Sequence, residues 1–180
     1  QDFKPGPLTV LIGPNGAGKS NFISFFRMIS WTLSPPGNLQ VHVGELGGAD
    51  ALLHDGSAKT REIEADLIFE MDNGVDQYAF RLVFAAGDTL IYAEEKFRFS
   101  RKDRLKDSLF PTVAPWKELG AGHRESQLIN RAASDETAKI IHKLLQKIKV
   151  YQFHNTSNTA RVRTKWSLED NRWLREDAGN

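Results

Sequence analysis

The sequence predicts a mixed α/β fold, and three features of the chain indicate it. A glycine-rich octet at residues 13–20 stands between an apolar segment and a segment with helical periodicity. Residues 61–99 alternate between apolar and polar side chains in runs that are separated by turn signals. Apolar residues make up 40% and charged residues 26% of the 180 residues, as in domains with a packed core. We therefore expect a strand–turn–helix unit followed by an antiparallel sheet.

The octet reads Gly-Pro-Asn-Gly-Ala-Gly-Lys-Ser and matches the P-loop pattern G-x-x-x-x-G-K-[ST] at every fixed position. The apolar stretch Leu8–Ile12 before it predicts a buried strand. The stretch Asn21–Ile29 after it predicts a helix. Strand, glycine-rich turn and helix are the context that this pattern requires, so the expected fold is a P-loop NTPase core with an antiparallel β-subdomain.

The residue types in the octet suit a polyphosphate ligand. Glycines at 13, 16 and 18 leave the backbone N–H groups open to an anion and permit positive φ angles. The following helix adds its unpaired N–H donors and the positive end of its dipole. We expect Lys19 to reach the β- and γ-phosphates of ATP and Ser20 to be a ligand of Mg²⁺. The candidate nucleotide-binding residues are Gly13, Pro14, Asn15, Gly16, Ala17, Gly18, Lys19, Ser20 and Asn21.

Composition excludes several other kinds of chemistry. The chain has no cysteine, which removes disulfides, zinc–thiolate sites and thiol nucleophiles, and is consistent with a reducing cytoplasm. No apolar run approaches the ~20 residues that a membrane helix needs, and no signal peptide is visible. We expect a cytoplasmic protein without a membrane partner. The net charge of +1 argues neither for nor against a nucleic-acid partner.

The helix after the octet carries a stripe of apolar residues on one face, which we expect to pack on a sheet. The stripe consists of Phe22, Phe25, Phe26, Ile29 and Leu33. The helix should end before Pro35, because a proline disfavours helical structure in the preceding residue. Residues 37–60, rich in Gly, Asp and Ser, are predicted to form a long connection.

Residues 61–99 predict an antiparallel meander, which would form a β-subdomain. The strands are expected at Arg61–Met71, Gln77–Ala85 and Thr89–Phe99, with turns at residues 72–74 and 87–88. The residues that alternation assigns to the apolar faces are Ile63, Ala65, Leu67, Phe69, Met71, Tyr78, Phe80, Leu82, Phe84, Ile91, Ala93, Phe97 and Phe99.

The remaining residues predict fewer regular elements. Residues 100–123 are expected to be mostly irregular, and Arg124–Arg131 a short helix. Ser134 is the predicted N-cap of a helix that runs to about Lys147. The stretch Lys149–Phe153 predicts a strand. The helix at 134–147 should bury Ala138, Ile141, Leu144, Leu145 and Ile148.

The octet followed by Asn21 and a Phe-rich helix resembles the ABC-class ATPase heads of the RecF, SMC and OLD type, and above all bacterial AAA family ATPases with such a head. The order of elements resembles them over most of residues 7–175. The resemblance implies an ATPase that uses ATP and Mg²⁺, dimerises head to tail through the nucleotide, and acts in DNA maintenance or phage defence. It implies that residues 1–180 are one partial domain, an ABC-ATPase-like N-terminal lobe. It also implies a γ-phosphate sensor among Gln152, His154 and Asn155.

Such heads also have a Walker B strand and a signature loop, and neither is convincing in this sequence. The segment 67–70 continues a one-sided alternating strand, and 82–88 ends in a turn. The segment 45–48 lacks the serine of a signature loop. We therefore expect both motifs, with the C-terminal lobe, beyond Asn180. No catalytic residue is identified in this segment, which would bind nucleotide and hydrolyse it weakly by itself.

Other functions remain open at the level of sequence. A P-loop kinase of a small molecule would need a lid with arginines, and the long meander argues against it. A module that holds nucleotide without turnover also fits. Two basic clusters, at residues 101–106 and 161–166, make DNA a further partner to consider, although interleaved acids favour a solvated surface. The histidines lack metal-ligand spacing.

Overall fold

The computed structural model describes residues 3–34, 37–102 and 114–151. The chain forms two compact units, which are taken separately below. The first comprises Gln1–Arg27 and Lys149–Asn180, and the second comprises Met28–Ile148. The division falls inside the helix α1 (Lys19–Thr32), which begins in the first unit and ends in the second.

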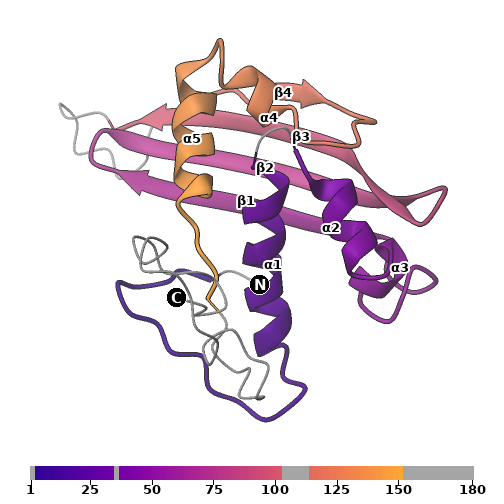
Figure 1. The fold of residues 1–180 in the computed structure, drawn as a ribbon. Helices are drawn as coiled ribbons and strands as arrows, with labels where there is room; N and C mark the ends of the chain where they lie inside the picture. Colours follow the sequence, from indigo (N-terminus) through magenta and orange to yellow (C-terminus); the bar gives the residue numbers. More distant parts are fainter. Residues whose placement is uncertain (1–2, 35–36, 103–113, 152–180) are drawn as a thin grey trace, which may run out of the picture. The chain divides into compact units, whose positions relative to one another are not determined.

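The second unit is built on an antiparallel sheet of four strands in the order β1-β2-β3-β4 (Figure 1). The strands are β1 (Glu62–Met71), β2 (Gly74–Ala85), β3 (Thr89–Arg101) and β4 (Lys117–Gly120). The predicted meander is therefore confirmed, including the turn in which Asp88 takes a positive φ of 55°. The fourth strand, β4, lies in a segment that we expected to be irregular, and pairs with β3.

The strand β3 contains a bulge that changes which of its residues face the core. Arg81 pairs with Glu94 but Leu82 pairs with Tyr92, so Ala93 is an extra residue on β3. One extra residue reverses the alternation of side chains. Leu90 and Tyr92 are consequently buried, and the prediction that Ile91 and Ala93 face the core is wrong.

Residues 37–60, predicted to be a long connection, contain two helices. They are α2 (Leu39–Glu45) and α3 (Ala49–Leu52). The N-terminus of α2 has no cap from its own neighbour Asn38. Instead the Glu125 carboxylate accepts hydrogen bonds from the backbone N–H of Leu39 at 2.7 Å and of Gln40 at 3.1 Å. A cap that comes from a distant part of the sequence cannot be recognised locally.

Two further helices follow β4. They are α4 (Leu128–Arg131) and α5 (Glu136–Gln146), which agree with the two helices expected there. The predicted N-cap is wrong by one residue, because the side chain of Asp135 accepts from the backbone N–H of Thr137 and Ala138. Ala138, Ile141 and Leu145 are buried as expected. The helix α5 crosses β2 and β3 (Figure 1).

The core of the second unit surrounds a buried carboxylate. Glu95 on β3 is 0% exposed. Its Oε1 accepts from the Tyr78 hydroxyl at 2.6 Å and from the Ser126 hydroxyl at 2.5 Å, and its Oε2 accepts from the backbone N–H of Gln127 at 2.9 Å. Burial raises the pKa of Tyr78 well above its ordinary value, so Tyr78 remains a donor. The surrounding apolar residues include Leu33, Leu39, Leu82, Leu90, Tyr92, Phe97, Leu128, Ile141 and Leu145.

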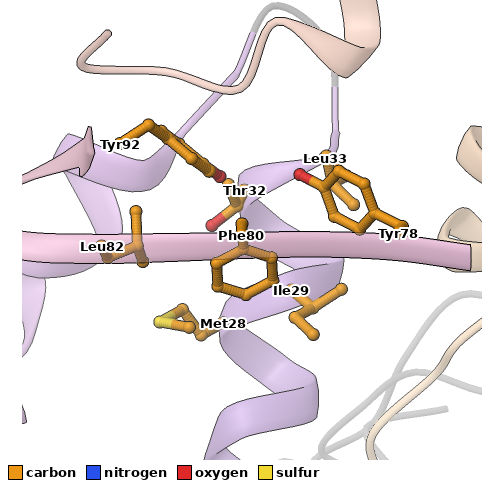
Figure 2. Close-up of a pocket in the computed structure, with 8 residues that line it drawn as sticks. All are labelled: Met28, Ile29, Thr32, Leu33, Tyr78, Phe80, Leu82 and Tyr92. Atoms are coloured by element: carbon orange, nitrogen blue, oxygen red, sulfur yellow. The ribbon is translucent and has the colours of Figure 1, made fainter. Parts of the chain in front are cut away.

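A small cavity lies between the end of α1 and the sheet (Figure 2). Its interior has room for about one water molecule, and its mouth is open to solvent. Ligand pockets generally measure about 300–1,000 Å³, so this cavity is too small to be the principal binding site. Its walls are Met28, Ile29, Thr32, Leu33, Tyr78, Phe80, Leu82 and Tyr92.

In the first unit, the predicted strand before the octet is not formed. Leu8 is 86% and Ile12 is 91% exposed, and no described strand pairs with them. A strand needs a neighbour for its backbone hydrogen bonds, and apolar character alone does not supply one. Lys149–Tyr151 are likewise not a strand, and residues 152–153 of that prediction lie outside the described residues.

The Phe residues of α1 form an aromatic cluster within the first unit. Phe22 contacts Phe3 and Phe26 edge to face, with ring centroids 4.8 Å and 5.1 Å apart. Phe25 contacts Phe26 at 5.4 Å. The phenylalanine part of the predicted stripe thus packs on itself and on Phe3, whereas Ile29 and Leu33 are buried in the second unit. Among the described residues, no helix is sufficiently long and apolar to cross a membrane.

Replacement of Asp76 by asparagine is expected to stabilise the protein above acidic pH. Asp76 on β2 is 2% exposed, and its Oδ1 has no hydrogen-bond partner in the part of the chain that the structure describes. Burial raises its pKa above the ordinary 3.8. The native state therefore holds this proton more tightly than the unfolded state, and wild-type stability is lost as pH rises from 3.8 through the raised pKa.

We expect Asp76→Asn to gain about 1–2 kcal/mol in the free energy of unfolding at about pH 8 relative to the wild type, and less than half of that at about pH 4. Urea denaturation at both pH values measures the difference. An equal effect at the two pH values would show that ionisation of Asp76 is not the cause.

The corrected N-cap of α5 can be tested with two neighbouring alanine substitutions. Asp135→Ala removes the acceptor for two backbone N–H groups and should cost about 1 kcal/mol of unfolding free energy. Ser134→Ala, its matched control, removes an exposed hydroxyl and should cost less than about 0.5 kcal/mol. Thermal unfolding followed by circular dichroism measures both variants. A larger loss of unfolding free energy for Ser134→Ala than for Asp135→Ala would show that Ser134 is the N-cap, as the sequence predicted.

Candidate functional site

The octet forms a turn that closes on its own backbone. The N–H of Ala17 donates to the carbonyl of Pro14 at 3.3 Å. Gly16 and Gly18 have φ angles of 84° and 83°, which L side chains rarely adopt. A Cβ atom added at either position would meet no atom within 4 Å. Glycine is therefore required here for the backbone conformation and for open access, and not because neighbouring atoms crowd it.

The Lys19 side chain folds back over the turn. Its Nζ donates to the carbonyl oxygens of Gly13 at 2.6 Å and Pro14 at 2.7 Å. These two hydrogen bonds use two of the three donors of the ammonium group. The positive charge is consequently held beside the backbone of the octet, where an anion would lie.

The N-terminus of α1 supplies unpaired donors at the same place. The first helical backbone bond runs from the N–H of Phe22 to the carbonyl of Gly18 at 3.0 Å. The N–H groups of Lys19, Ser20 and Asn21 have no acceptor among the described residues. The first turn of α1 contains no acidic residue that would neutralise the helix dipole. The geometry thus defines an anion site of backbone donors with one lysine.

This site is open at the surface of the first unit. Residues 13–18 and Ser20 are exposed, and Lys19 is half-buried. An exposed hydroxyl at the start of α1 is accessible to a ligand or to a hydrated cation. Within the described part of the chain, no group of three His, Cys, Asp or Glu residues could hold a metal ion. Ser20 as a ligand of Mg²⁺ stays a prediction.

The structure brings together one part of the predicted site and leaves another part undescribed. The nine candidates Gly13–Asn21 form the turn and the first turn of α1. Gln152, His154 and Asn155 lie outside the described residues. The carbonyls of Gly13 and Pro14, which hold Lys19, are a feature that the motif does not encode.

The segments that superficially resemble Walker B and signature motifs have other positions. Residues 67–70 lie in β1, an outer strand of an antiparallel sheet, and residues 82–88 form the end of β2 and its turn. Residues 45–48 connect α2 and α3. These three segments are therefore parts of strands, turns or helix connections, as the alternation and turn signals indicated for the first two. Of the basic cluster 101–106, Lys102 donates to the carbonyl of Met71 at 2.9 Å, and the second cluster lies outside the described residues.

The octet and its turn match the phosphate-binding motif of P-loop proteins, whereas the described sheet is antiparallel and the P-loop NTPase core that the sequence predicted is not confirmed by the described residues. The family described as "AAA domain, putative AbiEii toxin, Type IV TA system" matches residues 8–172, and the chain belongs to this family. The match includes the whole octet and the antiparallel sheet. Membership supports a P-loop AAA-type ATPase domain and a nucleotide-dependent function in general. No curated protein and no solved structure is similar enough to the chain to count as a match.

The requirement for glycine in the turn predicts different outcomes for two Gly→Ala substitutions. Gly18→Ala places a Cβ at a positive φ, which costs about 1–2 kcal/mol, and obstructs the anion site. We expect its affinity for ATP to fall more than about tenfold. Gly44→Ala, inside α2 with no neighbour within 4 Å, should leave ATP binding unchanged.

Isothermal titration with ATP and Mg²⁺ measures both variants, and circular dichroism checks that each remains folded. Equal affinities of Gly18→Ala and the wild type would show that ATP does not approach the backbone of the octet.

Proposed function

We propose that the chain binds ATP with Mg²⁺ at the octet and is the nucleotide-binding part of an ABC-type ATPase head. The observation that carries this proposal is the convergence of unpaired donors at the start of α1. At one exposed turn there are three backbone N–H groups without an acceptor among the described residues, a helix N-terminus without an acidic residue, and the ammonium of Lys19. A polyphosphate is the ligand that satisfies all of them at once.

The residues of the octet take different roles in this proposal. The backbone donors of residues 16–20 hold the phosphate oxygens. Lys19 exchanges its two neutral carbonyl partners for phosphate oxygens, and hydrogen bonds between charged groups are roughly twice as strong. The Ser20 hydroxyl at the start of α1 would be a ligand of Mg²⁺, which would supply positive charge to the phosphates when bound.

Hydrolysis needs a group that orients water, and no described residue is proposed for that role. We infer that a Walker B carboxylate and a signature loop come from outside the described residues, the latter from a second copy arranged head to tail. Closure over ATP and reopening after hydrolysis would then move an attached effector. A role in DNA maintenance or phage defence rests on the ABC-type resemblance. The family's name mentions a toxin of a type IV system, which supports the defence role.

Two alternative functions differ from ATP hydrolysis in what becomes of the bound ATP. A P-loop kinase would transfer the γ-phosphate to a small-molecule acceptor and would need no second copy. A non-hydrolysing module would bind ATP and release it unchanged. The antiparallel sheet of the second unit favours the ABC-type head over a kinase, because a kinase places a lid beside its P-loop.

The proposal is tested by comparing Lys19→Ala with Lys59→Ala. Both substitutions remove one lysine charge, but Lys59 is paired with Asp55 at the surface of the second unit. We expect Lys19→Ala to weaken ATP binding more than about tenfold and Lys59→Ala to leave it unchanged. Titration of a fluorescent ATP analogue with Mg²⁺ measures the affinities, and phosphate release measures turnover.

If Lys19→Ala bound ATP as tightly as the wild type, the assignment of the octet as the ATP site would be wrong. Phosphate release that requires an added acceptor molecule would favour the kinase. Tight binding without release would favour the non-hydrolysing module.

A further inference from the structure

The small cavity between the end of α1 and the sheet lies wholly within the second unit, because all of its lining residues fall in Met28–Ile148. Five of the eight lining residues are apolar, and the other three are hydroxyl-bearing: Thr32, Tyr78 and Tyr92. Figure 2 shows these three hydroxyl oxygens on one side of the Phe80 ring, with the hydroxyls of the two tyrosines pointing toward one another. The cavity therefore has a polar wall as well as an apolar one.

The hydroxyl of Thr32 is buried without a protein partner in the described part of the chain. Thr32 is 4% exposed, and its Oγ1 accepts and donates no hydrogen bond there. A hydroxyl in a helix often donates to the carbonyl four residues earlier, as Ser34 does to Ser30 at 2.8 Å. Thr32, the last residue of α1, does not form such a bond and lines the cavity instead. A buried hydroxyl without a partner is destabilising, so a partner inside the cavity would stabilise the fold.

The two tyrosines offer acceptors for that partner. The Tyr78 hydroxyl donates its proton to Glu95 at 2.6 Å, so its oxygen is left with lone pairs that can accept. The Tyr92 hydroxyl interacts with the hydroxyls of Tyr78 and Ser126. Burial raises the pKa of Tyr92 well above its ordinary value, so its phenol stays neutral. Two neutral phenol oxygens thus line the cavity together with the Thr32 hydroxyl.

The size and the polarity of the cavity select the ligand. Its interior has room for about one water molecule, which excludes any organic ligand. Cavities with purely apolar walls remain dry, whereas a buried water typically makes about three hydrogen bonds to polar groups that would otherwise lack a partner. Three hydroxyl groups around a space of this size meet both requirements of a water site.

We propose that one water molecule is bound in this cavity, where it accepts a hydrogen bond from the Thr32 hydroxyl and donates to the oxygens of Tyr78 and Tyr92. The water satisfies the buried Thr32 hydroxyl. It also connects α1 to the Glu95 carboxylate through Tyr78. The mouth of the cavity is open to solvent and gives the water a path of exchange.

The water gives α1 a polar contact on the side of the sheet. On the side of α5, the end of α1 already has two polar contacts. The Ser30 hydroxyl donates to the carbonyl of Ile148 at 3.2 Å, and the Nε2 of His142 donates to the carbonyl of Leu33 at 2.7 Å. Apolar contacts are not directional, whereas hydrogen bonds are. A water-mediated bond to Tyr78 therefore fixes the rotation of α1 about its own axis against the sheet.

The number of internal waters tests the site on the full chain. Thr32→Val keeps the shape of the side chain and removes its hydroxyl, so we expect it to hold one internal water fewer than the wild type. Thr32→Ser keeps the hydroxyl and should keep the water. Thr137→Val, a half-buried threonine on α5 outside the cavity wall, is the matched control and should change nothing. Oxygen-17 magnetic relaxation dispersion counts the internal waters of all four proteins.

The direction of the stability change is an independent test. With the water bound, Thr32→Val removes one of its partners and should lower the midpoint of thermal unfolding by about 2–4 °C. In a dry cavity, the same substitution would remove an unsatisfied hydroxyl and raise the midpoint. The midpoint of Thr137→Val should stay within about 1 °C of the wild type.

The methionines give the position of the water. The chain has two, of which Met28 lines the cavity and Met71 ends β1. After ¹³C labelling of both methyl groups, a long-lived water should transfer magnetisation to the Met28 methyl in the wild type and in Thr32→Ser. The transfer should be lost in Thr32→Val, whereas the Met71 signal, an internal control, should be the same in all variants.

Equal numbers of internal waters in the wild type and Thr32→Val, or a higher midpoint for this variant, would overturn the proposal. Loss of the water in Thr32→Ser would also overturn it, because the effect would then come from the methyl group. The water site is independent of the proposed ATP site. Thr32 and the octet belong to opposite ends of α1, so Lys19→Ala should leave the number of internal waters unchanged.

Discussion

The fold of the second unit depends on Glu95, whose side chain is buried. A carboxylate without access to solvent needs hydrogen-bond donors from the protein itself, so the segments that supply these donors must lie next to Glu95. Its three donors come from Tyr78 on β2 and from Ser126 and Gln127 before α4. An ionised group that is buried without partners is strongly destabilising, so the segment before α4 is fixed against the sheet. Ser126 in turn accepts from the N–H of Leu128 at 3.1 Å, which starts α4.

The consequences of that constraint extend to distant parts of the chain. The residue next to Ser126 is Glu125, whose carboxylate caps α2. The Gln40 side chain on α2 donates to the carbonyls of Leu90 and Arg124, both at 2.7 Å. One short segment thus connects β2 and β3 with α2 and α4. This explains how helices as short as α2 and α4, which would be unstable alone, persist in the fold.

The sequence predicted the elements that local rules determine. Alternation and turn residues were sufficient for β1, β2 and β3, and helical periodicity for α1 and α5. The octet was also predictable, because its eight residues are contiguous and its geometry depends on their own backbone. The helices α2 and α3 were missed because their first N–H groups donate to residues far away in the sequence, those of α2 to Glu125 and those of α3 to Asp88. The strand expected at Leu8–Ile12 was wrong because strand formation requires a partner, which composition does not supply.

The bulge at Ala93 explains both what the alternation rule missed and why the sheet has its charge pattern. Without an extra residue, the phase that buries Leu90 and Tyr92 would also turn Lys96 and Arg98 toward the core. The reversal at Ala93 lets Glu95 and Phe97 face inward instead, where Glu95 finds its donors and Phe97 is fully buried. The same reversal directs Lys96 and Arg98 to the face of the sheet opposite the core, where both lie beside Trp116. One irregular residue therefore links the packing of the core to the polarity of the opposite face of the sheet.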